Sequence, residues 1–115
     1  MFRFENLEIW KLAVNYAKEC YSLANKFPQK EQFSLSDQLR RAAISISNNI
    51  AEGSAFSNVK FKNFLDISIG SALETVNILL FAIEIGYIEK QKKEILYEDA
   101  DKLIRKIRSF KSYLN

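Results

Sequence analysis

The stretch from Asn58 to Ile85 constrains the fold most strongly, because it is apolar along two opposite sides of a helix. The first stripe, at steps of three and four, contains Phe61, Leu65, Ile69, Ala72, Val76, Leu79 and Ile83. The second stripe contains Ile67, Gly70, Ser71, Glu74, Ile78, Phe81 and Ile85. A surface helix of a globular protein needs only one apolar stripe. The second stripe needs a further partner, and the simplest one is another copy of the same chain.

Three other stretches each carry one apolar stripe with helical spacing. The first covers about residues 6–26, ends at Phe27-Pro28, and has the stripe Leu7, Trp10, Val14, Ala17, Tyr21 and Ala24. The next covers about residues 35–53 and has the stripe Leu35, Leu39, Ala43, Ile46 and Ile50. The last covers about residues 91–113 and has the stripe Leu96, Ala100, Leu103, Ile107, Phe110 and Leu114. Helix caps are predicted at Ser34, with Asp37 three residues on, and at Ser57 or Asn58.

The links between these four helices are short. Short links make consecutive helices neighbours that run in opposite directions. We therefore predict an all-α fold, an antiparallel up-down-up-down four-helix bundle that assembles as a symmetric homo-oligomer. The 115 residues are expected to form a single domain, residues 1–115.

The sequence has no histidine, which removes several kinds of chemistry. Histidine is the usual acid–base group at neutral pH and a member of the common nucleophile triads. With one cysteine and no histidine, a zinc site lacks its ligands. The three glycines stand too far apart for a phosphate-binding loop, and only Glu52 and Glu74 are candidates for a carboxylate metal site. We predict a protein that is not an enzyme and has no cofactor or metal.

Cys20 is the single cysteine, so no disulfide can form within the chain. This fits a reducing cytoplasm, and we interpret Cys20 as a small buried apolar residue. The longest uninterrupted apolar run, Ile78 to Ile83, is far shorter than the roughly 20 residues of a membrane span. No signal peptide is evident after Met1. We expect a cytoplasmic protein without membrane contact.

The predicted second helix has an unusual surface. Arg41, Ser45, Asn48 and Glu52 lie in one row, with Gln38 and Asn49 beside them. Small polar side chains are poor helix formers, but they allow another backbone to approach. Two interpretations remain open: a packed polar seam, in which Arg40 or Arg41 pairs with Glu52 or Glu74, and a solvated face. The residues of the predicted subunit interface are Arg40, Arg41, Ser45, Asn48, Asn49, Glu52, Ile67, Gly70, Ser71, Glu74, Ile78 and Phe81.

The net charge of +3 is unevenly distributed. Residues 90–115 hold eight Lys or Arg and four Asp or Glu. The candidate nucleic-acid contacts, which we call the basic cluster, are Lys102, Arg105, Lys106, Arg108 and Lys111. One interpretation is a solvated face whose aliphatic stems cover apolar neighbours. The other is a surface that faces an anion, nucleic acid first.

Most aromatic residues fall at core spacing. Phe56 is the exception, because it lies in a short link and is predicted to be exposed or at an interface. The sequence shows no alternation of aromatic and basic residues of the kind that stacks single-stranded bases.

The string Gln38-Leu39-Arg40-Arg41-Ala42, followed by Ser45-Ile46 and by Asn49-Ile50-Ala51-Glu52-Gly53, resembles the signature of a known family. This is the four-helix-bundle family of ribosomal RNA intervening-sequence proteins. The remaining features agree in order along residues 5–113, and they are Trp10, Phe27-Pro28, Glu31, Phe33, Phe64-Leu65, Gly70-Ser71, Glu74 and Gly86-Tyr87.

The resemblance implies a small bacterial cytoplasmic protein. It also implies similarity to the accessory variability determinant of diversity-generating retroelements, a pentameric barrel that binds nucleic acid and its reverse transcriptase. The family often has a basic residue three places after the signature glycine, where this chain has Phe56. That departure weakens the expectation of nucleic-acid binding at this position.

Two functions follow from the charge pattern and the resemblance. The first is a non-enzymatic homo-oligomer, implied to be a pentamer, that binds RNA or DNA through its basic outer surface. The alternative is a scaffold or accessory subunit that contacts a protein partner and no nucleic acid.

Overall fold

The four apolar stripes correspond to four α-helices in a computed structural model that describes residues 1–115. The helices are α1 (Glu8–Asn25), α2 (Leu35–Gly53), α3 (Asn58–Glu84) and α4 (Lys90–Tyr113), with short 3-10 helices at Arg3–Asn6 and Gln29–Glu31. The chain contains no strand, which confirms the all-α class.

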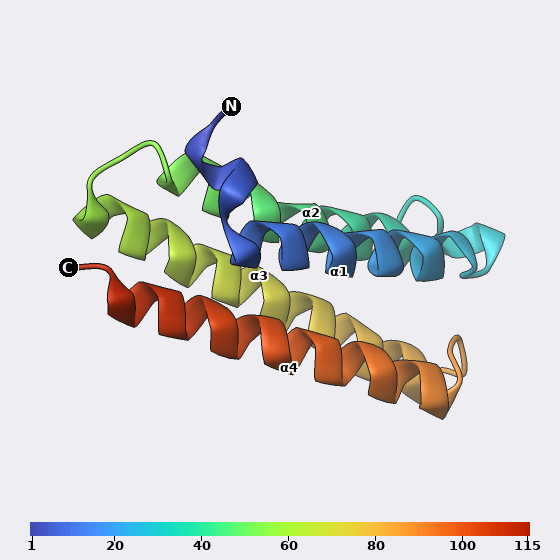
Figure 1. Ribbon diagram of the computed structural model, residues 1–115. Helices are drawn as coiled ribbons and strands as arrows, with labels where there is room; N and C mark the ends of the chain where they lie inside the picture. Colours follow the sequence, from blue (N-terminus) through green and yellow to red (C-terminus); the bar gives the residue numbers. More distant parts are fainter.

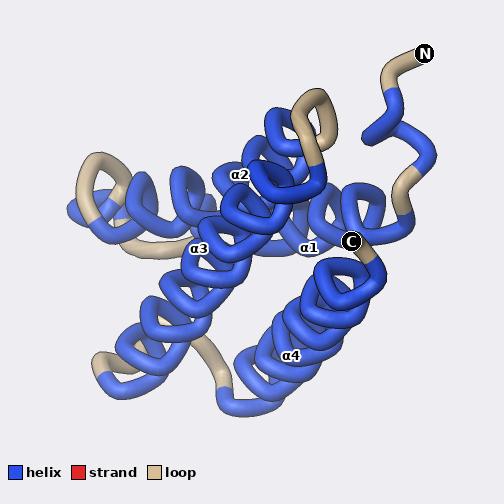
Figure 2. The backbone as a smooth tube through the Cα atoms, turned by 90° about the vertical axis from the view of Figure 1, so that its left-hand side faces the viewer, coloured by secondary structure: helices blue, strands red, loops and turns tan.

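The helices lie side by side in a bundle that measures 44 × 23 × 21 Å. Both termini and the α2–α3 link lie at one end, and the α1–α2 and α3–α4 links lie at the other (Figure 1). The α1–α2 pair is inclined to the α3–α4 pair (Figure 2), and the two pairs diverge away from the termini.

The first stripe of α3 forms the centre of the core. Phe61, Leu65, Ala72 and Leu79 are fully buried, because α3 contacts both α2 and α4. The stripes of α2 and α4 also face the core, as predicted. The stripe of α1 is shifted from the prediction: the buried residues are Ile9, Ala13, Tyr16, Ala17, Cys20, Leu23 and Ala24.

Helix α3 is also long and apolar enough, by length and composition alone, to cross a membrane. A central helix of a bundle has the same composition, because it packs against neighbours on two sides. In this structure the apolar residues of the first stripe have such neighbours in α2 and α4.

Small residues bring α2 and α3 close together. A Cβ added to Gly53 would lie 2.6 Å from Phe64 Cβ and 2.8 Å from Phe61 Cδ1. The Ser68 hydroxyl donates to the Ile46 carbonyl over 2.9 Å. The close approach of α2 and α3 therefore depends on the absence of a side chain at Gly53 and on the hydrogen bond from Ser68 to Ile46.

Replacing Gly53 with alanine should destabilise the fold by about 1–3 kcal/mol, the usual effect of overpacking. Phe64 Cβ is attached directly to the backbone of α3, so it cannot move aside without moving the helix. Urea unfolding followed by circular dichroism measures the change. A Gly53→Ala protein as stable as the natural one would contradict the close packing described above.

Both predicted cap residues take the N-cap position, but only one of them makes a side-chain cap hydrogen bond. Ser57 accepts a hydrogen bond from the Lys60 amide over 3.4 Å, as predicted for α3. Ser34 occupies the N-cap position of α2, as predicted, but its hydroxyl makes no cap hydrogen bond and donates to Glu31 Oε1 over 2.9 Å instead. Asp37 likewise binds the Arg41 Nε over 2.9 Å and completes no capping box.

Two links meet at the end of the bundle far from the termini. The Tyr87 hydroxyl donates to Glu31 Oε2 over 2.6 Å, and this bond lowers the pKa of the Glu31 carboxyl. The Tyr87 ring lies 5.7 Å from the Phe27 ring. Gly86, with φ of 81°, occupies a conformation that favours glycine and turns the chain into α4. Tyr87, through Glu31 and Phe27, therefore holds the α1–α2 and α3–α4 links together.

Candidate functional site

Arg105 and Arg108 of the basic cluster lie on the outer side of α4, away from the core residues Leu103 and Ile107. Other members lie at its edges, where they reach carboxylates of α1 and α3. Four members are exposed and Lys111 is half-buried. Three have carboxylate partners, at N···O distances of 2.7–3.2 Å: Arg105 with Asp101, Lys106 with Glu8, and Lys111 with Asp66. Lys102 and Arg108 have none within 4.0 Å.

A groove between the start of α1 and the end of α4 joins part of this cluster. It has a volume of about 640 Å³ and is lined by Glu8, Ile9, Lys102, Arg105, Lys106, Ser109 and Phe110. The ion pairs at its rim are exposed to solvent, and such pairs contribute at most about 1 kcal/mol. The cations can therefore exchange a carboxylate for a phosphate at little cost.

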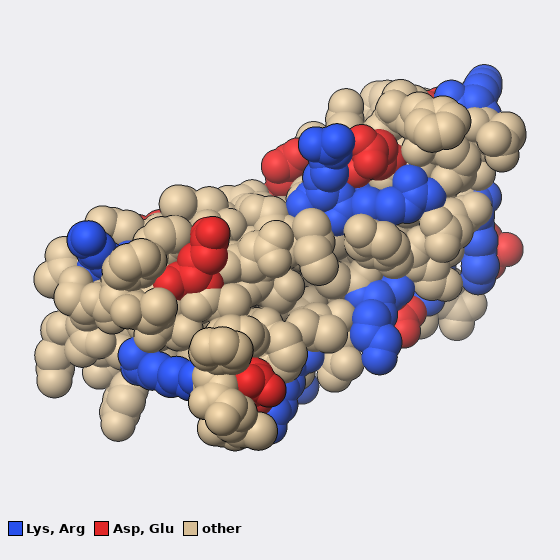
Figure 3. All heavy atoms as spheres, turned by 90° about the horizontal axis from the view of Figure 1, so that it is seen from above, with Lys and Arg blue, Asp and Glu red and all other residues tan.

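The surface charge is mixed on the face of the molecule that Figure 3 shows. Figure 3 shows Lys and Arg interspersed with Asp and Glu on the face seen from above, and other residues cover most of it. On this face no broad basic patch is visible, so the α4 groove is the stronger candidate for anion binding.

The outer side of α3 carries the second candidate surface. Ile67, Leu73, Leu80, Phe81 and Ile85 are exposed there, between 40% and 53%. We call these five residues the outer α3 face. Apolar side chains gathered on one exposed side often mark an interaction surface.

Two predicted interface residues do not reach this face. Ser71 and Ile78 are buried within the single chain, because α2 covers that edge of α3. The Ser71 hydroxyl hydrogen-bonds the Ser45 hydroxyl over 2.8 Å, and Asn49 Nδ2 donates to the Ser45 carbonyl over 2.8 Å. The polar seam thus exists in part, but it joins two helices of one chain.

The other members of the α2 row remain at the surface. Arg41, Asn48 and Glu52 are exposed, which agrees with the alternative of a solvated face for this part of the row. On α3, Gly70 and Glu74 are also exposed and lie beside the outer α3 face.

The predicted pairing of Arg40 or Arg41 with Glu52 or Glu74 is not found within the chain. Arg40 instead donates to the Gln32 carbonyl and Oε1, over 3.3 and 2.5 Å, and to Asn25 Oδ1 over 2.7 Å. Gln32 Nε2 in turn donates to the carbonyls of Ala24 and Phe27. The Ala24 carbonyl also accepts from the Phe27 amide over 3.2 Å, and Phe27 lies just beyond α1. The network therefore ties the end of α1 and the α1–α2 link to α2.

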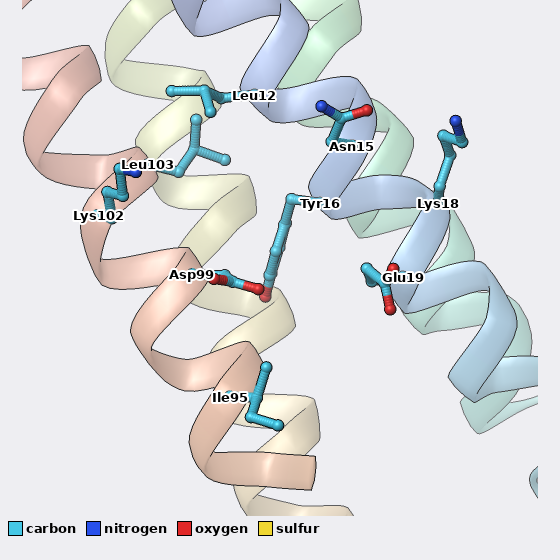
Figure 4. A pocket seen from close by; sticks show the side chains of 9 residues that line it. All are labelled: Leu12, Asn15, Tyr16, Lys18, Glu19, Ile95, Asp99, Lys102 and Leu103. Carbon is cyan, nitrogen blue, oxygen red and sulfur yellow. The ribbon is translucent and has the colours of Figure 1, made fainter.

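Sequence reasoning missed a cavity between α1 and α4 (Figure 4). It has a volume of about 450 Å³ and is lined by Leu12, Asn15, Tyr16, Lys18, Glu19, Ile95, Asp99, Lys102 and Leu103. Tyr16 extends from α1 toward α4, and its hydroxyl hydrogen-bonds Thr75 Oγ1 over 2.7 Å. Burial raises the pKa of Tyr16 far above its usual range. The sequence did not indicate this cavity because the buried side of α1 is shifted from the predicted stripe, which does not include Tyr16.

Cys20 is fully buried, and burial raises the pKa of its thiol to about 12. A thiol that stays protonated at neutral pH is a poor nucleophile. Its interpretation as a small buried apolar residue is confirmed. The chain brings together no group of three or more His, Cys, Asp or Glu that could hold a metal ion.

Comparison with known proteins identifies the fold and the family of the chain. A crystal structure of a protein with unknown function from the S23 ribosomal protein family of Bacteroides thetaiotaomicron superimposes with a TM-score of 0.83. The two chains are 24% identical, and the match covers 90% of this chain and 95% of the other, which establishes a shared fold. A search of curated proteins gave no significant match. Residues 5–109 match the family model described as 23S rRNA-intervening sequence protein, and the chain therefore belongs to this family.

Proposed function

We propose that this protein is a non-enzymatic, cytoplasmic homo-oligomer of antiparallel four-helix bundles that binds RNA or DNA through the outer surface of α4. The observation that carries the proposal is the separation of two surfaces. The cations of the α4 groove and the outer α3 face lie on different helices. One surface is thus available for assembly while the other remains open to a ligand.

Gly70 supports assembly through α3. Glycine in a helix interior is less favourable than alanine by about 1 kcal/mol. A Cβ at Gly70 would meet nothing within 4 Å, so the isolated chain gains no packing from the missing side chain. The backbone of a second subunit, packed closely against α3, would explain why glycine stands at this position. The pentameric state and the similarity to the retroelement accessory protein rest on the family resemblance and stay predictions.

Assembly also supports the binding proposal. The groove of one chain presents three cations, which is few for a nucleic-acid site. Copies arranged around a symmetry axis multiply the phosphate contacts. Each contact steepens the slope of log affinity against log salt concentration by about 0.7–0.9.

A titration of the purified protein with structured RNA at increasing salt tests the function. The logarithm of the affinity should fall linearly with the logarithm of the salt concentration, because phosphate contacts release counterions. A flat dependence, or no binding at low salt, would remove nucleic acid as the ligand. Recovery of protein partners that survive nuclease treatment would then favour the scaffold alternative.

A further inference from the structure

Two separate groups of aromatic rings come from segments at one end of the bundle, the end that holds both termini and the α2–α3 link in Figure 1. Phe2 stacks on Phe4, with ring centroids 5.9 Å apart and planes within 5°. Phe4 in turn lies 5.1 Å from Trp10. In the α2–α3 link, Phe56 stacks on Phe64 of α3, with centroids 5.7 Å apart and planes within 7°. We call these five residues the aromatic end.

Two rings of the aromatic end are open to solvent. Phe2 is 72% exposed and Phe56 is 48% exposed. Each is backed by a more buried ring that fixes its plane, Phe4 for the first and Phe64 for the second. An exposed ring held flat in this way is ready to accept another flat group on its surface.

Cations without acidic partners accompany these rings. The Lys60 ammonium lies 5.2 Å from the centroid of the Phe56 ring. The Arg3 guanidinium lies 5.2 Å from the centroid of the Phe61 ring and donates to the Ser54 carbonyl. Neither has a carboxylate within 4.0 Å, in contrast to Arg105 and Lys106 in the groove.

The aromatic end and the α4 groove are linked through one buried ring, that of Phe61. Phe110 lines the groove, and its ring packs 5.5 Å from the Phe61 ring that carries Arg3. Arg108, which has no carboxylate partner, lies one turn beyond Arg105 in the direction of this end. A phosphate backbone lying in the groove would therefore lead to the exposed rings.

We propose that the aromatic end binds unpaired bases of single-stranded RNA or DNA, which stack on Phe56 and Phe2 while Lys60 and Arg3 contact the phosphates. This inference rests on the nucleic-acid binding proposed above and names the form of the ligand. Every base has a flat π-face, so such a site tolerates any sequence. Base stacking is stronger than an exposed ammonium–ring contact, so Lys60 can leave the Phe56 ring to an arriving base. Bases inside a duplex are already stacked and cannot do this.

The test compares the affinity of the natural protein and of Phe56→Leu for oligo(U) of about 16 nucleotides and for a duplex of the same length. Leucine keeps the position apolar but removes the flat ring. We expect the variant to lose about fivefold or more in affinity for the single strand and to bind the duplex unchanged. Fluorescence of Trp10, the single tryptophan, should change when the single strand binds, because Trp10 belongs to the aromatic end.

Phe33→Leu is the matched control, since Phe33 is 94% exposed at the opposite end of the bundle. It should leave both affinities unchanged. Equal loss with the two variants, or no loss with Phe56→Leu, would overturn this inference and leave the proposed function intact. A Phe56→Leu protein with altered assembly size would also overturn it, by showing that Phe56 is a subunit contact. If the natural protein bound neither ligand, the inference and the proposed function would both fall.

Discussion

Replacing Phe81 with aspartate should separate the assembly into single folded chains. Phe81 is 51% exposed on the outer α3 face of one chain, and a neighbouring subunit would remove it from water. An unpaired carboxylate at such a position costs several kcal/mol. Light scattering should show a multiple of 13.4 kDa for the natural protein and about one chain mass for the variant, with helix content unchanged by circular dichroism.

Ile95→Asp is the matched control for this prediction. Ile95 is 50% exposed, but it lies on α4 beside the cavity toward α1. The same substitution at the same exposure should leave the assembly intact. Dissociation by both variants would show general destabilisation, and a natural protein of one chain mass would refute assembly through α3.

Removing Arg105 and Arg108 together should weaken nucleic-acid binding without changing the assembly. Both side chains are exposed, and the one ion pair that disappears, between Arg105 and Asp101, is exposed as well and adds little to stability. The slope of log affinity against log salt concentration should become shallower by about 0.7–0.9 for each phosphate that one subunit no longer binds. The total change is this value multiplied by the number of subunits that touch the ligand. Titrations of Arg105→Ala with Arg108→Ala at several salt concentrations give the slope directly.

Replacing Glu8 with glutamine should have the opposite effect at the same groove, namely stronger binding of nucleic acid. Glu8 lies 3.1 Å from Lys106 and is the acidic group that lines the groove. Removing its charge should free Lys106 and raise the affinity for RNA about two- to fivefold at low salt. If the glutamine variant bound more weakly, or the double arginine variant bound normally, the ligand would lie elsewhere on the molecule.

Helical periodicity in the sequence predicted the elements well. The stripes of α2 and α4 and the first stripe of α3 face the core, and the ends of these helices lie close to their predicted positions. The stripe of α1 was wrong because α1 packs against α2 and α4 at once. The face between these neighbours, with Ala13, Tyr16 and Cys20, is buried, and Tyr21, at the edge of the predicted stripe, is 41% exposed.

The polar residues of α2 also show where prediction from the sequence pattern stops. Their small size correctly indicated close packing, and the Ser45–Ser71 bond places it between α2 and α3. Pattern alone does not distinguish a neighbour in the same chain from a neighbour in another. Arg40 shows why: its partners, Gln32 and Asn25, lie in or before the α1–α2 link and match no helical spacing.

The sequence by itself determined the all-α class, the helices and the excess of positive charge on α4, because each of these depends on residues close together in the chain. Only the tertiary structure decided which of those charges are free. Glu8 and Asp66 come from other helices to pair with Lys106 and Lys111, and the ring of Phe61 in α3 meets Phe110 of α4 and Arg3 of the N-terminal segment only in the folded chain. Ion pairs and ring stacks act over a few ångströms, so they depend on how the helices are placed and not on the order of residues.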